Sequence, residues 1–597
     1  MVSVLKMRDA GLKLFRVSRR RLLIGGSGIT AVAGASGLWL GLQKRNELLY
    51  RVSADRDGAF APSVYLAIET TGKVTIWLTK SEMGQGVSTT LPMLVAEELE
   101  ADWTKVSVEQ AVTESAYNYG NQFTAASSST SGEWIMLRRA GATAKEMLLS
   151  AASSRWGVDV SDCYANNGVV YSRDGLHQAD FGSLAEDAAR EWAPIRPSLK
   201  TPENFNLVGT SIPRIDSRDK SSGAAVYGMD VGMDNLRYAK LTRCPVFGGT
   251  LDSVDEGLAR AVSGVTDVVK LQRGIAVVAE NTWAAMQGSS KLTPRWSANS
   301  SVLDSSEGVA ARLRHALERP DALLANGSDK ASSKDTEPYL TCDYELPYLA
   351  HMCMEPMNCT VSVSQDRCDM WVPTQAPLGA QQVAARITGL PESKIFVNVT
   401  QLGGGFGRRA SQDFVEEAVE LALQVDGPVK LVWSREDDIK HGVYREASAH
   451  RLTAYASDSG LLSSAWIHRV VTANYGSEMQ HQVPFTAVMG ATDMPYSIAE
   501  HQVEWVGVAG PVPTGIWRSV GYSYNTFAVE SFVDELAVAV GVDPVAYRLS
   551  LLANNASLVT CLERVAEMAQ WGVDRRHLGV ACLTFGQTQI AMIIEVK

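Results

Sequence analysis

Residues 401–409 read Gln-Leu-Gly-Gly-Gly-Phe-Gly-Arg-Arg and carry the pattern with the clearest chemical meaning. Four glycines in five positions let a backbone approach a ligand closely, and two arginines follow at once. A β-type stretch precedes the run at 395–399, and a helical stretch follows at 414–423. A glycine loop between a strand and a helix turns backbone N–H groups toward a phosphate. We therefore predict a phosphate- or pyrophosphate-binding loop, with a flexible turn as the alternative.

This glycine loop fits neither of the common nucleotide-binding motifs. A dinucleotide fingerprint requires glycines at its first, third and sixth positions, but the sixth position counted from Gly403 is Arg408. The loop also lacks the Gly-Lys-Ser/Thr ending of a P-loop. The expected ligand is therefore a phosphate compound other than the usual nucleotides.

Five other short segments are rich in glycine, small or amide residues. Gln85 lies between two glycines, so its side chain can reach a ligand without steric obstruction. Small residues before a helix leave N–H groups free for an anion, and an arginine beside small residues can reach one. The segments are Glu82–Gly86, Gln122–Ser128, Ala350–Asn358, Pro373–Pro377 and Val512–Gly521.

Length and composition limit the class of protein. A chain of 597 residues predicts several domains, and a net charge of −11 argues against a nucleic-acid-binding protein. The eight cysteines include no Cys-x-x-Cys pair, and the nine histidines have no zinc-site spacing, so we predict no protein-held metal. Cys353 and Cys359 form either a disulfide or two buried free thiols.

The N-terminal 45 residues form a separate segment. Residues 1–21 have a net charge of +6, and the 21 residues from Leu22 to Leu42 carry no charge but include six glycines. The junction Ser18-Arg19-Arg20-Arg21-Leu22-Leu23 resembles a twin-arginine export signal, which predicts a periplasmic protein. An uncleaved membrane anchor is the alternative.

The remaining chain predicts a multidomain α+β protein with regions at 55–200, 205–295, 335–560 and 575–597. A helix is predicted from Trp134 to Arg155. A second apolar stripe, from Val529 to Val540, predicts a helix whose acids, including Glu530, lie on a solvated polar face.

Taken in chain order, the glycine loop and the five other segments resemble the molybdenum hydroxylase superfamily of xanthine dehydrogenases and aldehyde oxidases. The run Trp433–Asp438, between the glycine loop and Val512–Gly521, adds to the resemblance. The resemblance is to the large, molybdopterin-binding subunit of isoquinoline 1-oxidoreductase beta-subunit type, and it extends over almost all of the chain after about residue 55. It implies molybdopterin-binding α/β domains at 55–200 and 335–560 in a permuted order, with an inserted α/β hammerhead-like domain at 205–295. Residues 575–597 would begin a final molybdopterin-binding segment.

The resemblance also implies which residues hold the cofactor. It implies that the glycine loop approaches the molybdenum pyranopterin and that a glutamine lies near the metal. It also implies that Arg408 and Arg409 pair with phosphates of a cytosine dinucleotide form. The residues implied are Gln85, Gly86, Ala125, Ala126, Ser127, Gln375, Gly404, Gly405, Phe406, Gly407, Arg408 and Arg518.

The implied reaction is hydroxylation of N-heterocycles or oxidation of aldehydes, with water as the oxygen source. Because this chain has no iron–sulfur cysteine spacing, electrons would pass to a small subunit with two 2Fe–2S clusters. A cytochrome c is a further expected partner.

The sequence departs from the family where the catalytic base is expected. The base glutamate of the family lies in a Gly-x-Gly-Glu-type segment close to the C-terminus, and this chain shows no such segment. Of the remaining acids Glu82, Glu355 and Glu530, Glu355 is the most tempting base, although its Met-Glu-Pro-Met turn favours a structural role. Two hypotheses follow: an active subunit whose base comes from a following polypeptide or an unrecognised residue, or a C-terminally truncated, non-catalytic relative that keeps cofactor- or partner-binding surfaces.

Overall fold

The computed structural model describes residues 58–113, 122–297, 305–327, 337–455, 465–475, 482–510, 512–573 and 577–597. The predicted export segment, residues 1–45, lies outside these ranges. Within them, no helix combines the length and the apolarity that crossing a membrane would require.

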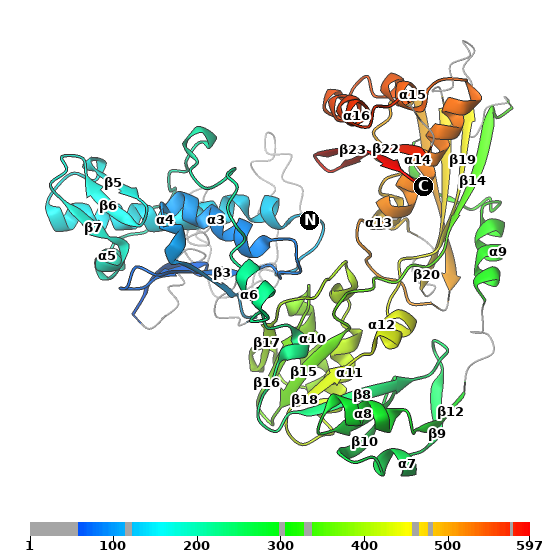
Figure 1. Cartoon of the computed structure of the whole chain (residues 1–597), viewed down its shortest axis with the longest axis horizontal. Helices are drawn as coiled ribbons and strands as arrows, with labels where there is room; N and C mark the ends of the chain where they lie inside the picture. The colour runs from blue at the N-terminus through cyan, green and yellow to red at the C-terminus, as the bar shows by residue number, and fades with distance from the viewer. Residues whose placement is uncertain are drawn as a thin grey trace, which may run out of the picture. The chain divides into compact units, whose positions relative to one another are not determined.

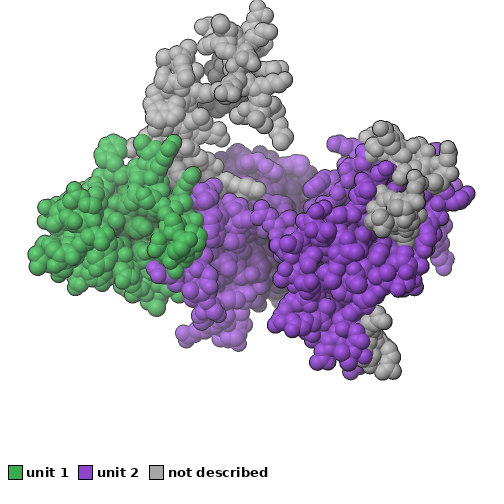
Figure 2. Space-filling model, turned by 90° about the horizontal axis from the view of Figure 1, so that it is seen from above, with its two compact units in different colours: residues 1–76, 95–107, 138–205 green, residues 77–94, 108–137, 206–597 purple. Residues whose placement is uncertain are grey.

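The chain divides into two compact units, coloured separately in Figure 2. One unit contains residues 1–76, 95–107 and 138–205, and the other contains residues 77–94, 108–137 and 206–597. Segments far apart in the sequence therefore fold together within each unit.

The N-terminal part of the chain forms a four-stranded sheet, two long helices and a small three-stranded sheet. Gly141 lets α4 pack closely on α3, because an added Cβ would lie 2.3 Å from the carbonyl oxygen of Val95. The predicted helix at 134–155 is confirmed but begins earlier, at Ser129. In chain order the elements are β1 (Phe60–Ser63), β2 (Leu66–Ile68), β3 (Val74–Leu78), α3 (Val87–Leu99), β4 (Val106–Gln110), α4 (Ser129–Trp156), β5 (Cys163–Asn166), β6 (Val169–Ser172), β7 (Gln178–Asp180) and α5 (Phe181–Ala188).

A seven-stranded sheet in the order β10-β11-β8-β18-β15-β16-β17 positions the glycine loop. Helices α10 and α11 pack on one face of this sheet, and α7 and α8 pack on the other face of β10 and β11 (Figure 1). The elements are α6 (Ser217–Ser222), β8 (Arg237–Arg243), β9 (Thr250–Asp255), α7 (Gly257–Arg260), β10 (Val265–Leu271), β11 (Gly274–Ala279), α8 (Thr282–Ser289), β12 (Thr293–Ser297), β15 (Asn358–Val363), β16 (Cys368–Val372), α10 (Pro377–Thr388), β17 (Ile395–Val399), α11 (Asp413–Ala422), β18 (Val429–Val432) and α12 (Arg435–His441).

Residues 205–295 and 335–560 share this sheet, although the sequence predicts them as separate regions. The parallel pair of β8 and β18 joins them, with Ala239 opposite Leu431. All eight cysteines are free, so Cys353 and Cys359 form no disulfide and are buried thiols.

A five-stranded sheet in the order β13-β21-β20-β19-β14 forms the second large layer. Helix α9 covers one face and α14 covers the other (Figure 1). The elements are α9 (Ser306–Ala316), β13 (Leu323–Asn326), β14 (Leu340–Leu346), β19 (Ser448–Tyr455), β20 (Ala465–Tyr475), α13 (Phe485–Val488), β21 (Glu500–Gly510), α14 (Tyr522–Ala539), α15 (Pro544–Leu551), α16 (Ala556–Met568), β22 (Leu578–Phe585) and β23 (Thr588–Glu595).

Glu530 corrects the predicted polar face of α14. Its side chain is buried, because the hairpin of β22 and β23 and helix α15 pack over it. Arg548 Nε and the backbone N–H of Cys582 donate to its Oε2, at 3.0 and 2.8 Å. The helix periodicity located the apolar stripe correctly from Val529 to Leu536, whereas Val540 follows the helix and is exposed. The periodicity could not show which neighbours cover the opposite side.

Two histidines are fully buried on neighbouring strands of the five-stranded sheet. Nδ1 of His450 lies 3.2 Å from Nε2 of His468. Burial lowers the pKa of His450 to about 3 and lowers the pKa of His468 well below its usual value. Both rings are therefore neutral at neutral pH.

We expect this pair to make the fold sensitive to mild acid. An unfolded histidine has a pKa of about 6.5, so the unfolded chain binds more protons than the native chain below that pH. The free energy of unfolding is therefore at its full value above about pH 6.5 and declines as the pH falls toward 3. At pH 5.5 each histidine lowers the free energy of unfolding by about 1.4 kcal/mol. Urea midpoints measured between pH 7.5 and 5.0 test this: His450→Gln should flatten the pH dependence, and the exposed His315→Gln should not. An unchanged slope in His450→Gln would contradict it.

Candidate functional site

The glycine loop, residues 401–409, connects β17 to α11, as predicted. Gly404 and Gly407 both have φ of +93°, in the region that side chains rarely adopt. Close neighbours fill the remaining space around the glycines. A Cβ on Gly407 would lie 2.1 Å from the carbonyl oxygen of Ile516, and one on Gly405 would lie 2.5 Å from Sδ of Met83. The glycines are thus required first by close packing of the protein on itself.

Gln375 ties the glycine loop to the segment before α4. Its Oε1 accepts from the backbone N–H of Gly407 (3.0 Å), and its Nε2 donates to the carbonyl oxygen of Thr124 (2.9 Å). The Thr124 N–H donates to the carbonyl oxygen of Gln375, and the Gln375 N–H donates to that of Arg409. Gln375 is only 3% exposed, so this tie is internal.

The Glu82–Gly86 segment joins the same cluster. The Ser81 N–H donates to the Thr124 hydroxyl (2.8 Å), and the Ser81 hydroxyl donates to the carbonyl oxygen of Thr374 (2.8 Å). Gln85 is exposed, and its amide bonds to the Met83 N–H and the Ser81 carbonyl oxygen. A second N–H of this amide remains for a ligand. Four predicted segments, distant in sequence, therefore meet within one unit.

Two runs of backbone N–H groups at this cluster fit an anionic ligand. Among the described residues, the N–H groups of Ala125, Ala126 and Ser127 have no hydrogen-bond partner, nor do those of Gly404, Gly405 and Phe406. The first run leads directly into the 28-residue helix α4, whose first turn adds free donors. Such consecutive donors form a concave site for phosphate or a similar group.

The 512–521 segment contacts the glycine loop through its backbone. The Ile516 carbonyl oxygen approaches Gly407 and also lies 2.7 Å from Nε2 of His351. Arg518, two residues further on, is exposed, and within the part of the chain that the structure describes its guanidinium has no hydrogen-bond or ion-pair partner. Its charge is available to a ligand.

Backbone strain marks these same segments. Left-handed φ values outside glycine are uncommon and tend to occur at functional sites. Six such residues belong to the predicted segments, including the β-branched Val520 at φ 45°. They are Ala126, Ser127, Met352, Phe406, Ser519 and Val520.

The predicted role of Arg408 and Arg409 in phosphate pairing needs correction. The Arg408 side chain is 1% exposed and makes two 2.8 Å hydrogen bonds to the carboxylate of Asp413. The Arg409 side chain is 0% exposed and donates to Glu355 and to the carbonyl oxygens of Gly404 and Pro373. Both guanidinium groups are structural ties of the loop, because internal partners already use both Nη groups of Arg408 and all three nitrogens of Arg409.

The three acids weighed as a base are also occupied. Glu355 accepts from the N–H groups of Met229 and Gly403, from Asn358 and from Arg409, as its predicted structural role requires. Glu82 accepts three backbone N–H groups, and Glu530 is enclosed by Arg548, Tyr496 and Cys582. None has a carboxylate oxygen free to take a proton from a ligand.

Sequence reasoning assigned no individual role to several residues that build this cluster, although Thr124 and Thr374 lie within predicted segments. Ser81, Thr124 and Thr374 connect the segments, but small hydroxyl residues carry no motif of their own. Arg214 and Lys220 contact Glu82, and Asp216 accepts from the hydroxyl of Ser88, just after the Glu82 segment. The opposite charges of Asp216 and Lys220, four residues apart, were the available signal.

Comparison with known proteins agrees with this arrangement. Two protein-family models match this chain, one over residues 22–235 and the other over residues 316–551. Both are described as a molybdopterin cofactor-binding domain. The chain is 30% identical to the beta subunit of the isoquinoline 1-oxidoreductase of Brevundimonas diminuta, over 90% of this chain and 77% of that protein. It belongs to the molybdopterin-binding family of that relative, within the molybdenum hydroxylases related to xanthine dehydrogenase.

Two further comparisons extend the likeness over shorter parts of longer proteins. The chain is 27% identical to a subunit of the nicotinate dehydrogenase of Pseudomonas putida, over 86% of this chain and 45% of that protein. The solved aldehyde oxidoreductase of Desulfovibrio gigas aligns with a TM-score of 0.53 at 16% identity, over 67% of this chain and 52% of that one. This alignment confirms the predicted multidomain α+β fold.

Proposed function

We propose that this chain is the cofactor-binding large subunit of a hydroxylase for N-heterocycles, with aldehydes as the second substrate class. The observation that supports it best is the hydrogen-bonded junction of the glycine loop, Gln375, Thr124 and the Glu82–Gly86 segment. The two curated relatives described above are named as subunits of an oxidoreductase and of a dehydrogenase, and both names refer to N-heterocycles, which favours this hypothesis over a non-catalytic relative.

The residues present fit a molybdopterin cofactor. When bound, it would supply two-electron oxidation with water as the oxygen source. The two runs of free N–H groups, at 125–127 and 404–406, would hold its anionic groups. Because there are two such runs, we propose the cytosine dinucleotide form, which carries a pyrophosphate. Gln85, Gln375, Gly86 and Gly407 would shape the site, and Arg518 would pair with an anionic group.

The partners and location follow from the sequence. The chain has no Cys-x-x-Cys pair, which supports a separate small subunit with two 2Fe–2S clusters and a cytochrome c as later electron acceptor. The cationic residues 1–21 and the uncharged stretch that follows support export to the periplasm by the twin-arginine route. None of Glu82, Glu355 and Glu530 is proposed as the base.

Co-expression with the small subunit and the maturation factors tests this function. The purified protein should contain molybdenum, pterin and, after acid hydrolysis, cytidine monophosphate in equal amounts. Protein without molybdenum and pterin would overturn the proposal, and another nucleotide would overturn the dinucleotide assignment. Isoquinoline, nicotinate and benzaldehyde, supplied with an artificial electron acceptor, distinguish the substrate classes.

Arg518→Ala separates cofactor binding from stability. Because Arg518 is exposed and unpartnered among the described residues, its loss should leave the urea midpoint unchanged. A lost charged hydrogen bond should lower cofactor content about tenfold at limiting cofactor supply. Arg196→Ala, which removes another exposed arginine, is the control. Normal loading of Arg518→Ala would remove Arg518 from the site.

A further inference from the structure

The Glu82 carboxylate holds the loop formed by residues 83–86. Its Oε1 accepts from the N–H groups of Gly84 (2.8 Å) and Gly86 (3.1 Å), and its Oε2 accepts from the Ser88 N–H (2.9 Å). The loop thus bends around one carboxylate, which also lies at the N-terminus of the 13-residue helix α3. Burial alone would raise the pKa of Glu82, but the Ser88 and Gly86 donors hold that pKa below its usual value.

Arg214 holds the loop from the other side. Its Nη1 donates to the carbonyl oxygen of Gly84 (2.8 Å), and its Nη2 donates to Glu82 Oε1 (3.2 Å). The same guanidinium makes two hydrogen bonds to Asp216, at 2.9 and 2.8 Å. Arg214 therefore contacts both the Glu82 carboxylate and the backbone of the 83–86 loop that this carboxylate holds.

Asp216 completes a balanced set of charges. Lys220 donates to its Oδ2 (2.6 Å) and lies 3.6 Å from Glu82 Oε1. The Ser88 hydroxyl lies between the two carboxylates, 2.9 Å from Glu82 Oε2 and 3.1 Å from Asp216 Oδ2. The negative charges of Glu82 and Asp216 are thus balanced by the positive charges of Arg214 and Lys220. The Glu82 side chain is only 3% exposed. We call Glu82, Ser88, Arg214, Asp216 and Lys220 the charge latch.

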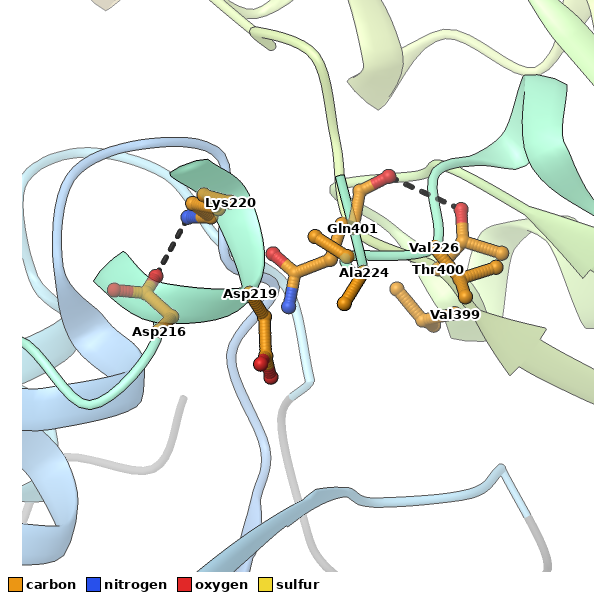
Figure 3. A pocket seen from close by; sticks show the side chains of 9 residues that line it. Asp216, Asp219, Lys220, Ala224, Val226, Val399, Thr400 and Gln401 are labelled. Carbon is orange, nitrogen blue, oxygen red and sulfur yellow. Dashed lines mark hydrogen bonds and ion pairs between the residues drawn. The ribbon is translucent and has the colours of Figure 1, made fainter. Parts of the chain in front are cut away.

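One side of the charge latch faces a cavity of about 360 Å³ beside β17 (Figure 3). Asp216 and Lys220 point toward one another there, whereas the Asp219 carboxylate points away from the pair. Asp219 is exposed and makes no side-chain contact with the latch, although it lies beside Lys220 on helix α6, which Asp216 precedes directly. It is therefore a matched control for Asp216.

We propose that Glu82 is a positioning residue, and that the charge latch fixes the 83–86 loop so that Gln85 and Gly86 meet the cofactor. The role of the 83–86 loop toward the cofactor rests on the proposed function. The contacts that make up the charge latch do not depend on it. The Glu82 carbonyl oxygen accepts from the Leu402 N–H, so the 83–86 loop and the glycine loop are joined at the same residue. Loosening one loop should disturb the other.

Glu82→Gln tests the proposal. An amide of the same shape places an NH2 group against backbone donors, so one or two of the three N–H contacts are lost. Hydrogen exchange of the peptide that contains residues 83–88 should become about tenfold faster, while peptides from the strands β15, β16 and β18, away from the glycine loop, should not change. Cofactor should dissociate about tenfold faster from the loaded protein. Asp216→Asn should cause a smaller change of both quantities, and Asp219→Asn should cause none.

Each other outcome has a defined meaning. Unchanged exchange of residues 83–88 in Glu82→Gln would overturn the latch. Faster exchange with unchanged cofactor dissociation would overturn the positioning role, because the loop would then be held for stability alone. Faster exchange throughout the protein would also overturn it. If the wild-type protein carries no cofactor, the proposed function fails, yet the exchange comparison still decides the latch. Arg214→Met should make cofactor dissociation faster than in the wild type. Arg214→Lys keeps the charge but loses the two-sided guanidinium contact, so its dissociation rate should lie between those of Arg214→Met and the wild type.

Discussion

Gly405→Val is expected to fold but to lose its molybdenum and pterin. A Cβ at Gly405 would lie 2.5 Å from Sδ of Met83 and 2.7 Å from Oε1 of Gln375, so the glutamine must move. Its 3.0 Å hydrogen bond to the Gly407 N–H would then break, and the run of free donors in the loop would change direction. Overpacking of this kind costs about 1–3 kcal/mol. Metal analysis and pterin fluorescence should show cofactor content reduced at least about tenfold.

A graded series distinguishes this effect from a general glycine effect. Gly405→Ala should retain intermediate loading, since the flexible Met83 side chain can move aside and one methyl group displaces the Gln375 amide less than the branched side chain of valine does. Gly579→Val, in strand β22 where nothing lies within 4 Å of an added Cβ, should load normally. Normal loading of Gly405→Val would show that the glycine loop is only a turn.

Arg408→Met is expected to destabilise the protein strongly. The variant would leave the Asp413 carboxylate buried without its two 2.8 Å partners, and such a loss costs about 3–5 kcal/mol. A phosphate-binding arginine would behave differently, because its removal would lower cofactor content and leave the apo-protein stable. The urea midpoint of cofactor-free protein therefore separates the two roles.

The double variant Arg408→Met/Asp413→Leu should recover much of this loss, because no buried charge then remains unpaired. Arg386→Met is the matched control: its side chain is 63% exposed and pairs with Glu416 at the surface, so little change is expected. A stable Arg408→Met protein with low cofactor content would restore the phosphate-binding hypothesis.

The sequence predicted the elements of the site better than the partners of its side chains. Strand β17, the glycine loop and helix α11 follow from local periodicity and glycine content, and the structure confirms them. The meeting of Gln375 with Thr124 spans 251 residues, and only the family resemblance brought these segments together. Local patterns carry no information about which distant backbone groups a side chain will reach.

Charge assignment was the weakest prediction, and the reason is burial. Arg408 and Glu530 stand at positions where sequence favours an exposed ionic group, but neighbours from other elements cover both. Asp413 and Arg548 are the matching charges, five and eighteen residues away. Arg518 has no such partner among the described residues, and it alone of the predicted cations remains available.

The free state of all eight cysteines bears on the order of events during biogenesis. The fold of the described residues needs no oxidant, and six of these thiols, including Cys353 beside the glycine loop, are buried. The described part of the chain can therefore reach its final structure in a reducing compartment. Maturation of this fold would then be independent of disulfide-forming enzymes.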